Sequence, residues 1–490
     1  MPTTNTEPTT EDQLESIIAA AAAAFDTWAR TPYADRGKVL TAVADALDDQ
    51  ADVLLPVAAR ETNLPDGRLK GELKRTTFQL RLFAEVLGEG SFLDARIDPA
   101  DAEWPMGAPR PDLRRQLEPM GPVVVFSASN FPFAFSVAGG DTASALAAGC
   151  PVILKAHSGH PELSLATGTI VQKALQAAGA PDGLFSVIFG TQAGRNALQD
   201  PRVKAGSFTG SIPGGRALFD VANSRPEPIP FYGELGSTNP VFVTRAAAAA
   251  RADEIAAGFA SSFTMGAGQF CTKPGVLFVP EGSSIPDKLP GQVTVQPAAL
   301  LNSRIQSGYV ESLDKLSSSS SVTALIRADN ALADPPAPTL LLTTAQEVME
   351  HQDELLAECF GPAALVVTYQ SEDQLLTIAN DLEGQLTATV QGEDSDDVAD
   401  LVRVLAKKAG RILWNQWPTG VSVTYAQQHG GPYPATTSAG STSVGTAAIT
   451  RFLRPVAYQN FPQHLLPEAL QDANPLRVPQ RINGSLTTAS

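Results

Sequence analysis

The sequence contains few cysteines and few histidines for a chain of 490 residues. Its three cysteines (Cys150, Cys271 and Cys359) cannot form a disulfide framework, and none stands in a Cys-x-x-Cys pair. The five histidines show no spacing typical of metal ligands, so we expect no metal site. This low cysteine usage is consistent with a protein of the reducing cytoplasm.

Basic residues and long apolar runs are also scarce. The 35 Lys and Arg residues are outnumbered by 52 Asp and Glu residues, which gives a net charge of −17. This balance argues against nucleic acid and anionic membranes as partners, because both need clustered positive charge. The short apolar run Ile17–Phe25 has acidic flanks and no preceding Lys or Arg, unlike a signal peptide. We interpret it as part of an amphipathic helix, capped at Thr10 with Gln13 completing a capping box.

The chain is too long for a single hydrophobic core, so two or three domains are expected. From Pro122 onward, short β-branched runs alternate with helical patterns, which predicts βαβ units and a parallel sheet. We therefore expect a Rossmann-like nucleotide domain, with strands at Val123–Phe126, Val152–Leu154, Phe185–Phe189 and Ala205–Phe208. A second α/β alternation after Pro240 has predicted strands at Val241–Val243, Val276–Val279, Ala364–Thr368 and Ile412–Trp414. Helical patterns are expected over much of residues 10–90, for example Ala42–Leu55, a surface connection over Pro335–Leu342, and a loop over residues 430–450.

Polar clusters follow three strands of the first alternation. Ser127–Pro132 follows the first strand, Lys155–Ser158 the second and Thr209–Gly215 the fourth. Ligands of open α/β sheets lie beyond the carboxyl ends of the strands, so these clusters should line one sheet edge. Gly210 and Ser211, at a helix N-terminus, could bind a phosphate. A glycine-rich turn alone is weak evidence, since glycines often only permit a tight turn.

Two further residues could carry chemistry. Cys271 lies among glycines in Gly266–Gly275, which leaves room for a substrate carbon beside the sulfur. The alternative is a buried structural cysteine, which would gain nothing from such neighbours. Glu234 lies between Gly233 and Gly236, where burial would raise its pKa toward that of a general base. A solvated loop carboxylate is the alternative for this residue.

Together, Asn130 before Phe-Pro, Lys155 after an apolar strand, Glu234-Leu-Gly, Gly268-Gln-Phe-Cys271 and Glu358-Cys-Phe-Gly-Pro362 resemble the aldehyde dehydrogenase superfamily. The resemblance covers residues 12 to 460. It implies that Cys271 attacks an aldehyde, that Asn130 stabilises the oxyanion and that Glu234 activates water to hydrolyse a thioester. It also implies a cofactor site at Lys155, Ser158, Gly210, Ser211, Gly214, Gly215, Leu235, Glu358 and Phe360, and a substrate pocket at Phe131, Phe133, Phe270 and Thr272.

The expected cofactor is NADP, with NAD as a second cofactor that the site would also accept. An NAD-preferring site usually carries an acid that binds the ribose 2′-hydroxyl, and the resemblance places that position at Ser158. Serine removes a charge that would repel a 2′-phosphate, while Lys155 adds a donor. His157 and His160 could add donors as well, or could be surface loop residues.

The variant turn after Gly210 and the segment after Glu234 resemble the branch containing 2-oxoglutarate semialdehyde (2,5-dioxopentanoate) dehydrogenases and NADP-linked long-chain aldehyde dehydrogenases. The first substrate is the leading expectation and a long-chain aliphatic aldehyde the alternative. The pocket of a carboxylate substrate should contain an arginine or a set of polar donors. A coenzyme-A-acylating enzyme and a nucleotide-binding protein without activity are rival interpretations, against which Glu234, Cys271 and Asn130 argue.

The resemblance also implies three structural parts. The cofactor-binding domain would comprise 1–106 and 121–235, and the catalytic domain 236–450. Segments 107–120 and 451–490 would supply oligomerisation strands and a tail. Strand addition across subunits would protect an open sheet edge, so a homodimer or a dimer of dimers is expected.

Overall fold

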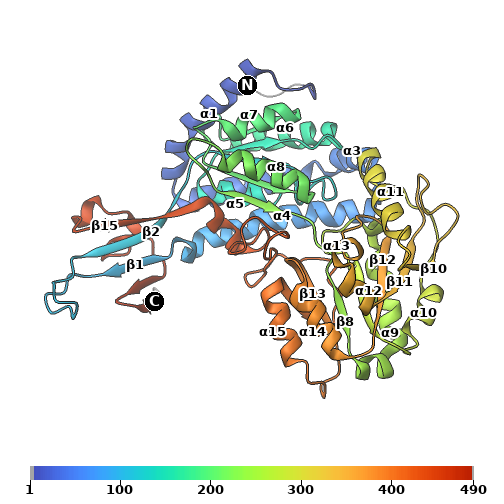
Figure 1. The fold of residues 1–490 in the computed structure, drawn as a ribbon. Helices are drawn as coiled ribbons and strands as arrows, with labels where there is room; N and C mark the ends of the chain where they lie inside the picture. Colours follow the sequence, from blue (N-terminus) through green and yellow to red (C-terminus); the bar gives the residue numbers. More distant parts are fainter. Residues whose placement is uncertain (1–4, 488–490) are drawn as a thin grey trace.

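The computed structural model describes residues 5–487, arranged around three β-sheets (Figure 1). The first sheet is parallel, with strand order β5-β4-β3-β6-β7. Its strands are β3 (Val123–Phe126), β4 (Val152–Lys155), β5 (Phe185–Ile188), β6 (Ala205–Thr209) and β7 (Phe231–Glu234). The connecting helices are α5 (Gly140–Ala148), α6 (Pro161–Ala177), α7 (Thr191–Gln199) and α8 (Ile212–Asn223). The predicted Rossmann-like alternation is confirmed.

Four N-terminal helices pack with this sheet: α1 (Glu11–Arg30), α2 (Tyr33–Asp49), α3 (Ala51–Thr62) and α4 (Asp66–Glu89). The predicted capping box is present, because the Thr10 hydroxyl accepts from the Gln13 N–H and the Gln13 side chain accepts from the Thr10 N–H. The helical pattern over Ala42–Leu55 is confirmed, but it spans the end of α2 and the start of α3. Gln50, at φ −104° and ψ 16°, has left the helical region and separates α2 from α3.

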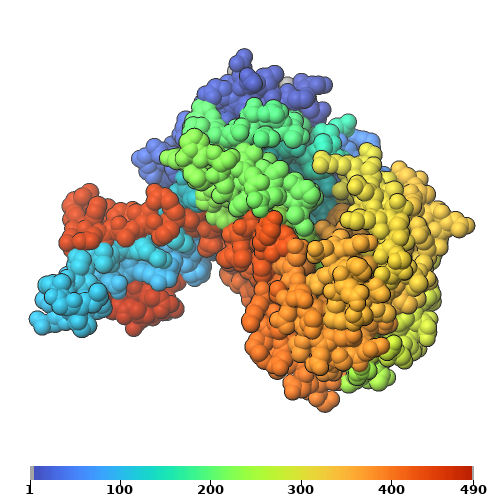
Figure 2. Space-filling view, viewed as in Figure 1, coloured from blue at the N-terminus to red at the C-terminus, as the bar shows by residue number. Residues whose placement is uncertain are grey.

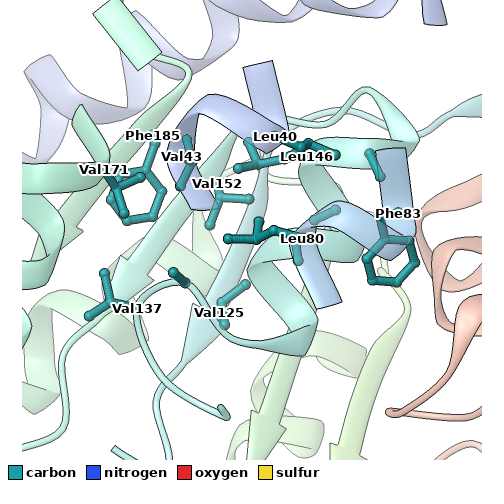
Figure 3. Close-up of a cluster of buried hydrophobic side chains, with 14 of the residues drawn as sticks. Leu40, Val43, Leu80, Phe83, Val125, Val137, Leu146, Val152, Val171 and Phe185 are labelled. Atoms are coloured by element: carbon teal, nitrogen blue, oxygen red, sulfur yellow. The ribbon is translucent and has the colours of Figure 1, made fainter. Parts of the chain in front are cut away.

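The core of this part lies between the sheet and the helices that cover it. Apolar side chains of α2, α4, α5 and α6 meet those of the strands, as Figure 3 shows for Leu40, Leu80, Leu146, Val152 and Phe185. The strands β3 and β5 are buried along their whole length, which explains their continuous apolar sequence. A sheet packed on both faces gives its carboxyl edge a rigid base.

The second sheet has seven strands in the order β10-β11-β12-β9-β8-β13-β14, all parallel except β10. They are β8 (Val241–Val243), β9 (Val276–Pro280), β10 (Thr323–Ile326), β11 (Thr339–Thr344), β12 (Ala363–Tyr369), β13 (Gln385–Gln391) and β14 (Ala409–Trp414). The helices are α9 (Arg245–Thr264), α10 (Ile285–Gln292), α11 (Ser303–Ser317), α12 (Ala345–Glu350), α13 (Gln352–Leu355), α14 (Glu372–Asp381) and α15 (Ala399–Lys408). The second α/β alternation is confirmed.

One prediction in this part is wrong, and two further strands, β10 and β13, were missed. The surface connection expected over Pro335–Leu342 ends at Pro338, after which β11 is a largely buried strand that pairs with β12. Its apolar Leu340–Leu342 run is typical of a covered parallel strand. The strand β13 is buried throughout, although Gln and Thr make up much of it. Its polar sequence therefore did not predict a strand inside the sheet.

The third sheet has the order β15-β2-β1-β16-β17 and projects from the rest of the molecule (Figures 1 and 2). Its strands are β1 (Ala95–Asp98), β2 (Leu113–Pro119), β15 (Leu453–Gln459), β16 (Gln480–Ile482) and β17 (Ser485–Thr487). The sequence predicts that this part begins at residue 107. Because β1 pairs with β2, the sheet begins earlier, at Ala95. Residues 1–4 and 488–490 of the predicted parts lie outside the described residues. Short 3-10 turns complete the fold: η1 (Ser91–Leu93), η2 (Met265–Gly268), η3 (Thr446–Phe452), η4 (Gln463–Leu465) and η5 (Glu468–Leu470).

The expected loop of residues 430–450 runs between the first two parts, as the orange-red segment near the centre of Figure 1. It lies along β7, since the Leu235 N–H donates to the Ala435 carbonyl and the Gly233 N–H to the Thr437 hydroxyl. This loop therefore meets the carboxyl end of β7. Within residues 5–487, no helix is long and apolar enough to cross a membrane.

Candidate active site

The segment that carries Cys271 has an unusual backbone. Gly266, Ala267 and Gly268 all adopt left-handed φ values, of 57°, 55° and 68°. A Cβ on Gly268 would lie 2.0 Å from the Gly361 carbonyl oxygen, so only glycine fits there. This close approach brings the Cys271 segment against the Glu358–Pro362 motif.

Asn239 fixes the backbone on either side of the thiol. Its side-chain amide donates to the carbonyls of Cys271 and Lys273, both at 2.9 Å. Asn239 is fully buried, and its own N–H donates to Gln385 on β13. The nucleophile candidate is thus held by the central strands of the second sheet.

Glu234, His429 and Cys271 form a contiguous cluster. The His429 Nε2 atom lies 2.9 Å from the Glu234 Oε1 atom and 3.5 Å from the Cys271 Sγ atom. The Ser443 hydroxyl donates to the other oxygen of Glu234 at 2.6 Å. Glu234 is 3% exposed and His429 is 1% exposed, whereas Cys271 is half-buried and open to a ligand. A single imidazole nitrogen can therefore exchange a proton with either the thiol or the carboxylate.

The electrostatics of this cluster differ from those expected from the sequence. Burial alone would raise the pKa of Glu234, but its contacts with His429, Ser443 and Cys271 outweigh burial and hold the pKa below its usual range. Removal from water raises the pKa of the Cys271 thiol well above its ordinary value, and the Glu234 charge raises it further. In the resting cluster Glu234 is therefore ionised and the Cys271 sulfur is protonated. The sequence predicts that burial raises the pKa of Glu234, and the structure corrects this direction.

The ligand atoms of Glu234, Cys271 and His429 all lie within 4.8 Å of one another. Three such atoms could also receive a soft divalent cation, a grouping that spacing along the chain does not show. The contacts described above account for the same three residues as a proton-transfer cluster.

Asn130 lies beside the segment that carries the thiol. One of its side-chain N–H groups donates to the Gln269 carbonyl at 3.2 Å, two residues before Cys271. An amide nitrogen carries two donors, so a second N–H is left for a ligand. This placement fits the predicted oxyanion role of Asn130.

The other two thiols differ from Cys271. Cys150 is fully buried and donates to the Phe452 carbonyl, and burial raises its pKa to about 11. Burial likewise raises the pKa of Cys359 to about 11. Both are therefore protonated at neutral pH and packed as small apolar groups.

The predicted phosphate-binding residues lie at the carboxyl edge of the first sheet. Gly210 and Ser211 are exposed at the N-terminus of α8, and Gly214 follows in its first turn. A Cβ on Gly215 would lie 2.0 Å from Leu235, so that glycine lets the helix pack against the segment after Glu234. The Gly210, Gly214 and Gly215 N–H groups already donate within the protein, so the exposed position and the dipole of this helix N-terminus are what fit the pyrophosphate of a dinucleotide.

The second strand supplies the remaining predicted contacts of this edge. Lys155 ends β4 with its charge partly buried, and burial lowers its pKa. Ser158 is exposed, and no acid lies between Lys155 and His160. His160 is buried and stacks on His157 at 5.5 Å, and the Nδ1 atom of the half-buried His157 accepts the Gly159 N–H, so neither is a free surface residue.

Glu358 and Phe360 lie in the Glu358–Pro362 segment, which Gly268 approaches at Gly361. Removal from water raises the pKa of Glu358 to about 7, although Lys273 and the Ser237 N–H pull it down. Phe360 is half-buried. Both fit the predicted contact with the nicotinamide half of a cofactor.

Some of the predicted pocket residues pack beside Cys271. Phe131 packs against Phe270 with ring centroids 5.4 Å apart, next to Cys271, and Thr272 is buried beside the same thiol. Phe133 is 2% exposed and its side chain belongs to the buried core cluster, so its place in the pocket stays a prediction. Phe135 also lies at this site, with its ring 5.3 Å from Phe131 and 6.3 Å from His429.

Sequence reasoning missed four residues of this site. His429 and Ser443 come from an irregular loop without any periodic signal, and only the folded chain brings them to Glu234. Arg68 and Arg75 lie on α4, and their seven-residue spacing on one helix face was a signal that the sequence offered.

The sequence matches the aldehyde dehydrogenase family over residues 2–296 and 337–455. It is 46% identical to the alpha-ketoglutaric semialdehyde dehydrogenase 2 of Azospirillum brasilense, over 96% of this chain and 91% of that protein. It is 42% identical to the alpha-ketoglutaric semialdehyde dehydrogenase of Acinetobacter baylyi, over 98% of this chain and 92% of that protein.

Solved structures share the fold at lower identity. A 3,6-anhydro-L-galactose dehydrogenase superposes with a TM-score of 0.77 at 21% identity, covering 94% of this chain and 97% of that one. A 1-pyrroline-5-carboxylate dehydrogenase from Thermus with bound NAD gives a TM-score of 0.76 at 19% identity, covering 92% and 86%. The three-part architecture is thus that of known dehydrogenases.

Proposed function

Since the chain belongs to the aldehyde dehydrogenase family and is an oxidoreductase that acts on aldehydes, we propose that it oxidises 2-oxoglutarate semialdehyde to 2-oxoglutarate with NADP as its preferred cofactor. The observation that carries the substrate is identity of 46% and 42% to two enzymes of that name over nearly the whole chain. The cluster of Cys271, Glu234 and His429 supplies the groups that the chemistry needs.

The first step is attack of the Cys271 sulfur on the aldehyde carbon. The thiol is protonated at rest, so its proton must leave as the carbon–sulfur bond forms, and His429 at 3.5 Å is placed to take it. The new oxyanion lies within reach of the second Asn130 N–H and the Cys271 backbone N–H. When bound, NADP supplies the hydride acceptor that the oxidation requires.

Cys271 then carries the acyl group as a thioester, which water must cleave. Glu234 is the base for this step, because it is ionised and lies beside Cys271; its lowered pKa makes the carboxylate a weaker base, so position rather than basicity supports this role. Attack of water breaks the carbon–sulfur bond, releases the carboxylic acid and returns the proton to sulfur. Retention of Glu234 supports hydrolysis over transfer to coenzyme A.

The preference for NADP is supported by the charges around Ser158. No carboxylate stands at that position, and Lys155 lies close by. Arg304, at the start of α11, adds a second positive charge near Ser158, since it acts electrostatically on both Lys155 and His157. Arg304 is exposed and pairs with no acid among residues 5–487. Positive charge without an opposing acid favours a 2′-phosphate.

Steady-state kinetics with 2,5-dioxopentanoate, succinic semialdehyde and decanal, each with NADP and with NAD, tests the proposal. We expect the largest kcat/KM for 2,5-dioxopentanoate with NADP. A larger value for decanal would contradict the substrate, and a larger value with NAD would contradict the cofactor preference. A product that forms only with added coenzyme A would contradict hydrolysis.

We also propose that the protein assembles as a homodimer or a dimer of dimers through its third sheet. The outer strands β15 and β17 have free edges, and Phe461, Leu465 and Leu486 expose apolar surface on the same projecting part. Sedimentation of the intact protein tests this, and a monomer at micromolar concentration would contradict it.

A further inference from the structure

One face of α4 carries two arginines toward the reacting cysteine. Arg68 and Arg75 are seven residues apart, which places them on the same side of the helix about 10 Å apart along its axis. Both act electrostatically on Cys271, and Arg75 acts on Glu234 as well. Neither belongs to the proton-transfer cluster of Cys271, Glu234 and His429.

Arg68 lies in the aromatic pocket. Its guanidinium stacks over Phe270 at 4.5 Å and over Phe131 at 5.1 Å, and one nitrogen donates to the Asn130 carbonyl at 2.6 Å. The other terminal nitrogen is buried and has no partner in the part of the chain that the structure describes. Contact with both rings and the bond to Asn130 hold this guanidinium in place and leave one donor for a ligand.

Arg75 has two free donors. Its guanidinium lies over Phe135 at 5.2 Å, and both terminal nitrogens are buried without a partner among the described residues. The Phe135 ring in turn lies 6.3 Å from His429. Two parallel N–H groups in one plane match the two oxygens of a carboxylate.

Two carboxylates lie near this pair, Glu72 and the ionised Glu234, which acts on Arg75. Glu72 lies between the two arginines on α4 and interacts electrostatically with both. However, one oxygen of Glu72 already accepts the N–H groups of Phe133 and Ala134, at 2.8 and 3.0 Å. Glu234 is engaged by His429 and Ser443, so neither carboxylate bonds to a guanidinium of this pair, and the positive charge has no hydrogen-bonded anion among residues 5–487. Such charge is unfavourable in a buried site unless a ligand supplies the partner.

We propose that Arg68 and Arg75 bind the carboxylate end of the substrate and so select an aldehyde that carries an acid group at its far end. This inference rests on the proposed function and names the residues that give it specificity. Arg75 donates two hydrogen bonds to the carboxylate, while Arg68, beside Phe131 and Phe270, adds a third donor. An apolar long-chain aldehyde would leave these donors buried and unpaired, which disfavours that substrate.

The test compares two aldehydes in Arg68→Met and Arg75→Met: 2,5-dioxopentanoate, which has the carboxylate, and pentanal, which has the same chain length and none. For each variant we expect kcat/KM for 2,5-dioxopentanoate to fall at least 100-fold, mainly through KM. For pentanal the fall in kcat/KM should be at least tenfold smaller, because that substrate loses only the effects of the arginines on Asn130 and Cys271. Inhibition by 2-oxoglutarate should weaken in parallel. Arg75→Lys should retain part of the selectivity that Arg75→Met loses, because lysine keeps the positive charge but lacks the paired N–H donors of the guanidinium.

Lys74→Met is the matched control, since Lys74 is an exposed cation on the same helix. It should leave both aldehydes unaffected. Equal losses for both aldehydes in the arginine variants would overturn the inference and assign the pair to the thiol or to folding. Failure of the wild-type protein to oxidise 2,5-dioxopentanoate would instead contradict the proposed function, so the two failures are distinguishable.

Discussion

Replacing Glu234 by glutamine should change two properties of Cys271 in opposite directions. The Glu234 charge raises the pKa of the thiol, and the two groups lie within 4.8 Å of each other. Two unit charges at about 4.8 Å repel by about 3 kcal/mol with an effective dielectric constant near 20. Loss of that repulsion would increase the thiolate fraction by up to about 100-fold, since each ~1.4 kcal/mol is a factor of ten.

The assay for the first property is alkylation of Cys271 by iodoacetamide at pH 7 without cofactor. We expect the variant to react at least tenfold faster than the wild type. The assay for the second is NADPH formation from an aldehyde. The first turnover should survive as a burst, while steady-state turnover should fall about 100-fold or more because the base for thioester hydrolysis is gone.

Ser443→Ala provides the control, because it removes a hydrogen bond to Glu234 without removing the charge. Its alkylation rate should stay close to that of the wild type. Slower alkylation of the glutamine variant would refute the reasoning, since it would make Glu234 the group that activates the thiol in the resting enzyme.

Three further predictions concern the cofactor edge and the Cys271 segment. Burial raises the pKa of Glu358 to about 7 in the folded state, so the folded protein binds more protons and loses stability between pH 4.5 and 7. Glu358→Gln should remove that loss, and its Tm relative to wild type should rise with pH across this range. Asn239→Ala strips two carbonyls of their donor and should lower the free energy of unfolding by about 3 kcal/mol, measured in urea. Arg304→Ala should reduce the ratio of kcat/KM for NADP to that for NAD by about tenfold; an unchanged ratio would exclude Arg304 from the 2′-phosphate site.

The order of strands and helices could be predicted where apolar patterning is strong. The strands β3 and β4 are short buried β-branched runs, and each is followed by a polar cluster at the edge where ligands bind. β13 was missed because its Gln385 and Thr387 side chains look like those of a surface segment. In the fold they are buried and bond to the segment of residues 237–239 that fixes Cys271. A polar residue at the centre of a sheet is visible only when its distant partners are known.

The site shows the same division between local and long-range information. Cys271 and Glu234 stand in motifs whose glycines are needed for local backbone reasons, so the sequence around each identifies it. His429 lies in a loop that could pack anywhere, and its role depends on the hydrogen bonds that lay residues 435–437 along β7. The direction of the Glu234 pKa follows from that packing, because burial alone predicts a rise and the arrival of His429 and Ser443 reverses it. A catalytic carboxylate identified by its motif therefore still needs its distant neighbours before its protonation state can be assigned.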